Sequence, residues 1–140
     1  MTYMAAQALL KTRLLTITGS FDSGEVTEGD VRILDNNPGN AAVLFPGAIP
    51  VYDTSIMQRS VAWEGVLDLF TKFVDDTSYS TFGTLRDAVI SNLDASPCLD
   101  ATYWVISIVS DGDPIELYDQ QGAGPFYLWQ RLRLTITEQV

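Results

Sequence analysis

The sequence contains no histidine and only one cysteine, Cys98. A single cysteine cannot form a disulfide within its own chain, and without histidine there is no zinc site of the usual Cys/His kind. A cysteine nucleophile also needs a neighbouring base, and no histidine is present to act as one. We therefore expect no metal, no cofactor and no catalytic residue, and we expect Cys98 to be a half-buried structural residue.

Basic residues are also scarce. Eight Lys and Arg stand against eighteen Asp and Glu, which gives a formal net charge of −10. The basic residues are scattered along the chain, so they form no run that could neutralise successive phosphates. We expect no specific nucleic-acid binding. An acidic surface still allows DNA to slide past, because like charges create no binding site from which the DNA must escape.

Long hydrophobic runs are absent, since no apolar stretch approaches the roughly 18 residues that span a bilayer. The first residues also lack the basic and then hydrophobic regions of a signal peptide. The composition, 46% hydrophobic and 19% charged, is typical of a folded domain and not of a disordered chain. For a chain of 140 residues we expect one soluble domain with one core, no membrane segment and no export.

The clearest positive signal is a change of hydrophobic period. Residues 59–73 alternate with period two and predict a long strand, in which Leu67 and Leu69 face the core while Val66, Asp68 and Phe70 face the other way. Residues 75–77 provide capping and negative charge for a following helix. The predicted core face of that helix recurs at three and four residues and consists of Tyr79, Phe82, Leu85, Val89, Ile90 and Leu93.

The other segments predict the remaining elements. Residues 4–15 predict a helix, residues 21–56 a long acidic loop region with short strands at 31–34 and 41–45, and residues 126–137 a long closing strand. Residues 102–109 are rich in Tyr, Trp, Val and Ile, as a central strand would be. The predicted face of the first helix consists of Met4, Ala5, Ala8, Leu9, Lys11 and Leu15.

This order of elements predicts an α+β fold. We expect a mostly antiparallel sheet with the N-terminal helix and the central amphipathic helix packed on one face, long loops, and a single domain over residues 1–140.

Two carboxylates, Glu64 and Asp68, share a face of the predicted long strand. Four residues of strand separate them by roughly 13 Å, whereas the carboxyl groups of a glycosidase lie about 5–9.5 Å apart. We therefore interpret both as solvated residues and not as a catalytic pair.

The same face of the long strand and one face of the closing strand are candidates for contact with another subunit or partner. Aromatic residues beside arginines, as on the closing strand, are the composition favoured at protein interfaces. For Trp129 the alternative is an aromatic ladder packed under the N-terminal helix. The candidate interface residues are Val66, Phe70, Tyr127, Trp129, Arg131 and Arg133.

Several stretches together resemble a known family. They are residues 63–73, the helix containing Thr84-Leu85-Arg86-Asp87-Ala88-Val89-Ile90, the break at residues 93–97, and the closing stretch from Gly124-Pro125-Phe126 into Leu132-Arg133-Leu134-Thr135-Ile136. In these stretches the chain resembles the tail terminator, or tail completion, proteins of long-tailed (siphovirus-type) bacteriophages. The resemblance covers about the C-terminal two thirds of the chain, with a weaker match at Phe45-Pro46-Gly47.

The resemblance implies a small α+β virion protein without catalytic residues. Such proteins form a hexameric ring on the end of the tail tube, stop tail elongation and make the surface to which the head attaches. The implied partners are further copies of the chain, the tail tube protein and a neck or head-completion protein. The implied location is the head-proximal end of the tail in the virion, after synthesis in the host cytoplasm.

A ring of six copies would carry a formal charge of about −60, so DNA could pass through an acidic bore without specific binding. The candidate bore residues lie in the acidic loop and are Asp22, Glu25, Glu28 and Asp30. One alternative is a head-closure or neck adaptor protein, which binds on the portal side. The other is a small hydrolase or ligand-binding domain, which requires a deep apolar pocket with convergent polar groups.

Overall fold

The computed structural model describes residues 2–17, 21, 25–29, 34, 38–46, 51–54, 59–110, 112–118 and 125–139. Within these residues the chain forms two helices and seven strands. In chain order they are α1 (Thr2–Leu15), β1 (Val26–Glu28), β2 (Asn40–Pro46), β3 (Val51–Thr54), β4 (Arg59–Lys72), α2 (Ser78–Ala95), β5 (Tyr103–Ser110), β6 (Ile115–Tyr118) and β7 (Pro125–Gln139).

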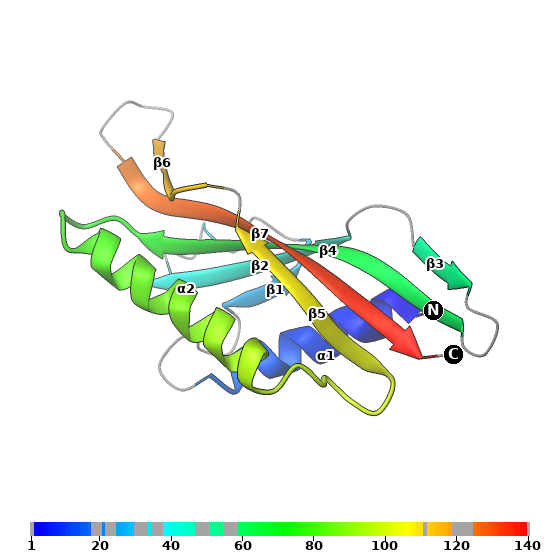
Figure 1. Ribbon diagram of the computed structural model, residues 1–140. Helices are drawn as coiled ribbons and strands as arrows, with labels where there is room; N and C mark the ends of the chain where they lie inside the picture. The colour runs from blue at the N-terminus through cyan, green and yellow to red at the C-terminus, as the bar shows by residue number, and fades with distance from the viewer. Residues whose placement is uncertain are drawn as a thin grey trace.

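The strands form one sheet with the order β1-β2-β4-β7-β5, in which β3 also pairs with β4 and β6 also pairs with β7 (Figure 1). All these pairings are antiparallel except that of β1 with β2. The pairing of β4 with β7 is the longest in the described sheet, from Ser60 opposite Gln139 to Lys72 opposite Tyr127. The predicted α+β fold with a mostly antiparallel sheet is confirmed.

Both helices cover the same face of the sheet (Figure 1). The main core lies between the helices and this face, and it includes Leu67 and Leu69 of β4 with Leu132 and Leu134 of β7. Because side chains alternate along a strand, the intervening residues of β4 and β7 point to the opposite face. We call this opposite face the outer face.

Helix α1 buries a different side from the predicted one. Ala6, Leu10 and Leu14 face the core, and the Gln7 amide donates a hydrogen bond of 3.0 Å to the carbonyl oxygen of Leu44. The prediction was wrong because leucine occurs at positions 9, 10, 14 and 15, so two neighbouring sides of the helix are similarly apolar. On the predicted face, Ala5, Ala8 and Leu15 are exposed, whereas Leu9 is half-buried and packs against the core.

Helix α2 follows its predicted pattern more closely. Its buried apolar residues are spaced three and four apart, while Tyr79 is 42% exposed. Thr77 is the N-cap residue, but its side chain does not cap the helix. Instead the Asp75 carboxylate accepts hydrogen bonds from the hydroxyl and the backbone N–H of Thr77, and these bonds lower the pKa of Asp75. The buried apolar residues of α2 are Phe82, Leu85, Val89 and Leu93.

Strand β5 lies at an edge of the sheet and not at its centre. Its residues Trp104, Ile106 and Val109 are 44%, 62% and 54% exposed. The prediction of a central strand was wrong because a high density of β-forming residues is compatible with edge and central strands alike. A register shift between Val105 and Ser107 interrupts the pairing of this edge with β7.

The acidic region contains more strand than the sequence predicted. The strand expected at residues 41–45 is confirmed as β2, whereas β1 and β3 were missed, because three or four residues carry too little periodicity to recognise. Apart from Leu34, the strand expected at residues 31–34 falls outside the described part of the chain.

We predict that Leu132→Ala lowers the free energy of unfolding by about 2–5 kcal/mol, because Leu132 is fully buried in the main core and its truncation leaves a cavity. As a control, Val74→Ala alters a side chain that is 74% exposed and changes this free energy by less than about 0.5 kcal/mol. Urea unfolding followed by circular dichroism measures both. Equal effects would contradict the placement of Leu132 in the core.

Candidate functional site

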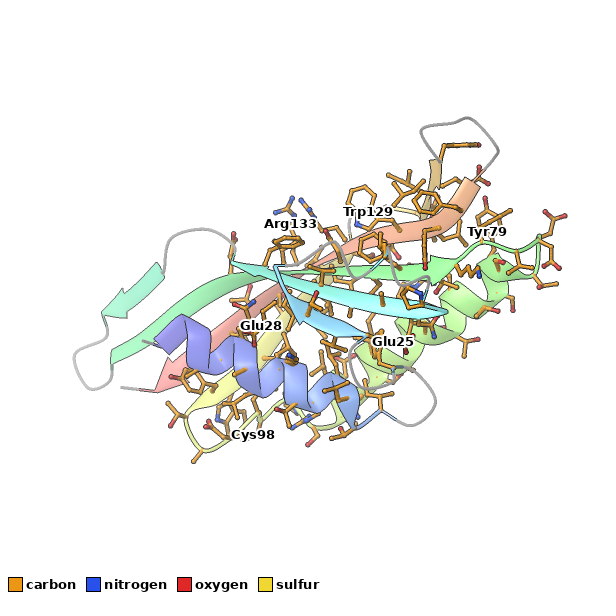
Figure 2. All side chains as sticks on the ribbon, turned by 180° about the vertical axis from the view of Figure 1, so that it is seen from behind. Glu25, Glu28, Tyr79, Cys98, Trp129 and Arg133 are labelled. Atoms are coloured by element: carbon orange, nitrogen blue, oxygen red, sulfur yellow. The ribbon has the colours of Figure 1, made fainter. Side chains whose placement is uncertain are left out.

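The structure places all six candidate interface residues on the outer face. They come from β4 and β7, whose register aligns them in cross-strand pairs: Val66 opposite Arg133, and Phe70 opposite Trp129. Figure 2 shows Trp129 and Arg133 on the side of the sheet away from the helices. The alternative that Trp129 packs under the N-terminal helix is therefore wrong.

One end of the outer face is closed by a small second core. Phe70 and Tyr127 are 5% and 1% exposed, and their rings meet edge to face at 6.4 Å between centroids. The Tyr127 hydroxyl donates a hydrogen bond of 2.7 Å to the carbonyl oxygen of Pro38, and Leu34 packs against the same cluster. Phe70 and Tyr127 are thus interior residues of the isolated chain.

A partly buried ion pair lies in the middle of the outer face. The Arg131 guanidinium donates from Nε to Oδ1 of Asp68 at 2.8 Å and from Nη2 to Oδ2 at 3.0 Å. The Asp68 side chain is only 6% exposed, so its interpretation as a solvated residue was wrong, whereas Glu64 is exposed as expected. The error arose because the sequence does not show which residue of the closing strand stands opposite Asp68.

The same arginine also contacts the neighbouring tryptophan. The guanidinium carbon of Arg131 lies 5.6 Å from the centroid of the Trp129 ring, within the range of a cation–π contact. Arg131 is therefore held from two directions, by the Asp68 carboxylate and by the indole. A side chain that is already ordered loses less conformational entropy when a partner binds.

Beyond this closed end, the outer face is exposed at Arg133 and half-buried at Val66, Trp129 and Arg131. Val66, Arg133 and Val109 stand in one row across β4, β7 and β5, and Trp129 stands beside Ile115 of β6. Val109 and Ile115 are 54% and 53% exposed. We call this surface the Trp129 patch, and it consists of Val66, Val109, Ile115, Trp129, Arg131 and Arg133.

A hollow of about 160 Å³ lies within the Trp129 patch. Asp113 and Gln130 add polar groups to its lining, which otherwise comes from the patch itself. Drug-sized ligands need pockets of about 300–1,000 Å³, so the hollow matches one protruding side chain better than a small molecule. Sequence reasoning missed Val109 and Ile115, because their exposure depends on β5 and β6 lying at the edge of the sheet.

Of the four candidate bore residues, the structure describes Glu25 and Glu28. Glu28 ends β1 and is exposed, whereas Glu25 precedes the strand and is half-buried. Burial, followed by the negative charge of Glu25, raises the pKa of Tyr127. Asp22 and Asp30 lie outside the described residues.

A cluster of two tyrosines and a carboxylate joins α2 to β6, and sequence reasoning did not find it. The Tyr79 hydroxyl donates to Oε1 of Glu116, and the Tyr118 hydroxyl donates to Oε2 at 2.7 Å. The bond to Glu116 raises the pKa of Tyr79 to about 12, and both tyrosine bonds lower the pKa of Glu116. This cluster connects the helical layer to the sheet end beside the Trp129 patch.

Cys98 is half-buried, as predicted, and its Sγ lies 2.7 Å from the carbonyl oxygen of Asp100. Among the described residues, no three Asp, Glu or Cys side chains gather into a possible metal site. Neither α1 nor α2 has both the length and the apolar character that crossing a bilayer requires.

Among solved structures, the chain is similar to a protein in the virion of a native gene transfer agent particle and to the gp17 protein of bacteriophage SPP1. The first is 14% identical over 96% of this chain and 92% of that chain, with a TM-score of 0.45. The second is 15% identical over 94% of this chain and 91% of that chain, with a TM-score of 0.47. Both scores lie below 0.5, so neither similarity decides fold or function. No protein-family model and no curated protein matches the chain.

We predict that Asp68→Ala lowers the free energy of unfolding by about 1–3 kcal/mol, because it leaves a partly buried guanidinium without its carboxylate. This loss of unfolding free energy is smaller than the loss for a fully buried pair, because the Arg131 side chain is 37% exposed and water can hydrate it in the variant. Asp87→Ala is the matched control. It breaks a contact of 3.6 Å to Arg86 at a carboxylate that is 73% exposed, and its effect is below about 0.5 kcal/mol. Urea unfolding that gives equal losses for the two variants would contradict the buried pair.

We also predict that Glu116→Gln lowers the pKa of Tyr79 from about 12 towards its ordinary value of 10.0, because the charged acceptor of the hydroxyl is removed. The Tyr79 pKa is raised by folding, so its stabilising effect is present below pH 10 and is lost as the pH rises through about 12. The pKa of Glu116 is lowered by folding, so the stabilising effect of this carboxylate is present above pH 4.5 and is lost as the pH falls below that value.

Ultraviolet titration of the tyrosinates measures this shift. The difference between titration curves recorded with and without the Tyr79→Phe substitution isolates the titration of Tyr79. Glu64→Gln changes an exposed carboxylate elsewhere in the sheet and serves as the control. A Tyr79 titration that is the same in Glu116→Gln and in Glu64→Gln would contradict the hydrogen bond.

Proposed function

We propose that this chain is a structural protein of a bacteriophage virion, a tail terminator. In this role copies assemble as a ring, hexameric in the family that the sequence resembles, on the end of the tail tube. The ring stops tail elongation and forms the surface to which the head attaches. The partners are therefore further copies of the chain, the tail tube protein and a neck or head-completion protein.

The observation that carries the proposal is the Trp129 patch on the open face of the sheet. A sheet with one apolar face normally buries that face against another layer. Here the helices cover only one face, and the other exposes Val109 and Ile115 beside the half-buried Trp129 and two arginines. Exposed apolar surface with this composition is typical of protein contact sites. A protein that functions by assembly needs such a surface.

The charge of the chain supports a ring through which DNA passes without binding. A formal charge of −10 for each copy gives an assembled ring a strongly acidic character. DNA that must leave the head through such a ring is repelled by its wall and does not bind to it. The acidic bore assigned to Asp22, Glu25, Glu28 and Asp30 remains part of this proposal.

A head-closure or neck adaptor protein is the alternative that shares most of these features. It also assembles through a contact surface, but it binds the portal side of the junction. The hydrolase or ligand-binding alternative has less support, because the hollow at the Trp129 patch measures about 160 Å³ and ligand pockets usually measure about 300–1,000 Å³.

We predict that a phage lacking this gene makes tails of abnormal, mostly excessive length, because no ring ends the growing tube. Electron microscopy of lysates gives the distribution of tail lengths, and supplying the gene from a plasmid is the control. Tails of normal length would overturn the terminator proposal. Normal tails together with filled heads that leak DNA would identify the neck adaptor instead.

A further inference from the structure

The two tyrosines and the carboxylate that join α2 to β6 lie together with a third aromatic side chain, Phe73. The Tyr79 ring meets the Phe73 ring edge to face, at 6.0 Å between centroids. Tyr79 and Tyr118 both donate to the Glu116 carboxylate, yet they are 42% and 60% exposed. We call these four residues the Glu116 cluster, and Figure 2 shows Tyr79 at the end of the molecule where α2 begins. Aromatic rings that are open to solvent therefore stand beside a carboxylate.

The Glu116 carboxylate has room for further donors. Each of its oxygens accepts one tyrosine hydroxyl, whereas an ionised carboxylate offers about four acceptor positions. The bonds from Tyr79 and Tyr118 lower the pKa of Glu116, so the carboxylate is ionised at neutral pH. An ionised carboxylate beside aromatic rings matches a cationic side chain, which gains a charge-assisted hydrogen bond and a cation–π contact together.

Two basic residues of the chain, Lys72 and Arg86, flank this region in the sequence, and the structure places both away from the cluster. Alternation along β4 puts Lys72 on the outer face, whereas the cluster lies on the side of the helices. Arg86 lies about 10 Å further along α2 than Tyr79. There it lies 3.6 Å from the Asp87 carboxylate and donates to the side-chain oxygen of Gln130 at 3.5 Å.

The surroundings of the cluster are acidic and apolar. The bond to Glu116 is the main cause of the raised pKa of Tyr79, and the negative charge of Asp76 adds to it. Val74 and Phe126 are 74% and 41% exposed, and a backbone hydrogen bond of 2.9 Å from Phe73 to Phe126 holds this end of β7 beside the cluster. The apolar surface thus extends beyond the carboxylate, which fits a protein surface better than a free small cation.

We propose that the Glu116 cluster binds an arginine side chain on the surface of a different protein. The guanidinium donates to the Glu116 carboxylate and lies against the ring of Tyr118, the more exposed of the two tyrosines. Apolar neighbours of that arginine contact Val74 and Phe126. Arginine fits better than lysine, because its planar group can stack on a ring while it donates to a carboxylate.

A second copy of the chain is the less suitable occupant, because two chains that each carry a formal charge of −10 repel each other. A partner with a basic surface is attracted instead. The inference concerns one chain and its basic partner, so it does not depend on the proposed ring.

NMR titration of the isotope-labelled protein with three probes tests the site. The probes are N-acetyl-arginine amide, its citrulline analogue, which keeps the shape without the charge, and the peptide acetyl-Ala-Leu-Arg-Leu-Ala-amide. We expect saturable shifts of the backbone amides at residues 73–79 and 115–118. The arginine probe should bind about fivefold more tightly than the citrulline probe. The peptide should bind more tightly than either, because its leucines can contact Val74 and Phe126.

Four variants assign the binding to the cluster. Glu116→Gln keeps the size of the side chain and should remove the preference for arginine over citrulline. Glu64→Gln removes an exposed carboxylate elsewhere in the sheet and is the matched control, which should keep this preference. Tyr118→Leu should weaken binding of the arginine probe about threefold, because the ring is lost. Tyr118→Phe keeps the ring and should bind the probe at least as well as wild type.

The outcomes distinguish the site from its occupant. Equal binding of the arginine and citrulline probes to wild type would overturn the site, and so would a preference that persists in folded Glu116→Gln. Equal affinities for the peptide and for N-acetyl-arginine amide would overturn the protein partner in favour of a small cation. Self-association in sedimentation velocity that Glu116→Gln abolishes would overturn it in favour of a second copy. Tail length enters none of these measurements, so the proposed function is tested separately.

Discussion

The pairing of β4 with β7 is the constraint on which the other elements depend. Strands β2 and β3 attach to β4, strands β5 and β6 attach to β7, and β1 attaches through β2. One register aligns Leu67 with Leu132 and Asp68 with Arg131. Since the side-chain period of a strand is two, this register sends the leucines to the helices and the charged pair to the outer face. A slip by one residue would exchange the two faces of a strand.

The ion pair at the centre of this pairing links the register to the surface. With Asp68 turned towards the main core, its carboxylate would be buried among leucines without a cation, which is strongly unfavourable. In the observed register the carboxylate is satisfied by both bonds from Arg131, and Arg131 is held beside Trp129. The ion pair of Asp68 with Arg131 thus helps to specify the register of β4 with β7, and it orders the middle of the Trp129 patch.

The placement of the few cations is informative in so acidic a chain. Arg13 donates hydrogen bonds of 2.5 Å and 2.7 Å to the carbonyl oxygens of Ser96 and Cys98, which joins α1 to the segment after α2. Arg131 joins β7 to β4, whereas Arg133 on the same strand face is exposed. Two of these arginines therefore hold the layers and strands together, and the third lies beside Asp113 at the hollow of the outer face.

The sequence by itself determined the elements with a long, unambiguous period: α2, the two long strands, the division of their side chains between two faces, and hence the α+β class. It also placed the six candidate interface residues on one face of each long strand, because alternation is a local property of a strand. Only the tertiary structure decided which side of α1 is buried, that β5 is an edge strand, that Phe70 and Tyr127 are covered, and that Asp68 meets Arg131. Each of these depends on a partner far away in the sequence, and local spacing carries no information about which distant segment will stand opposite a given residue.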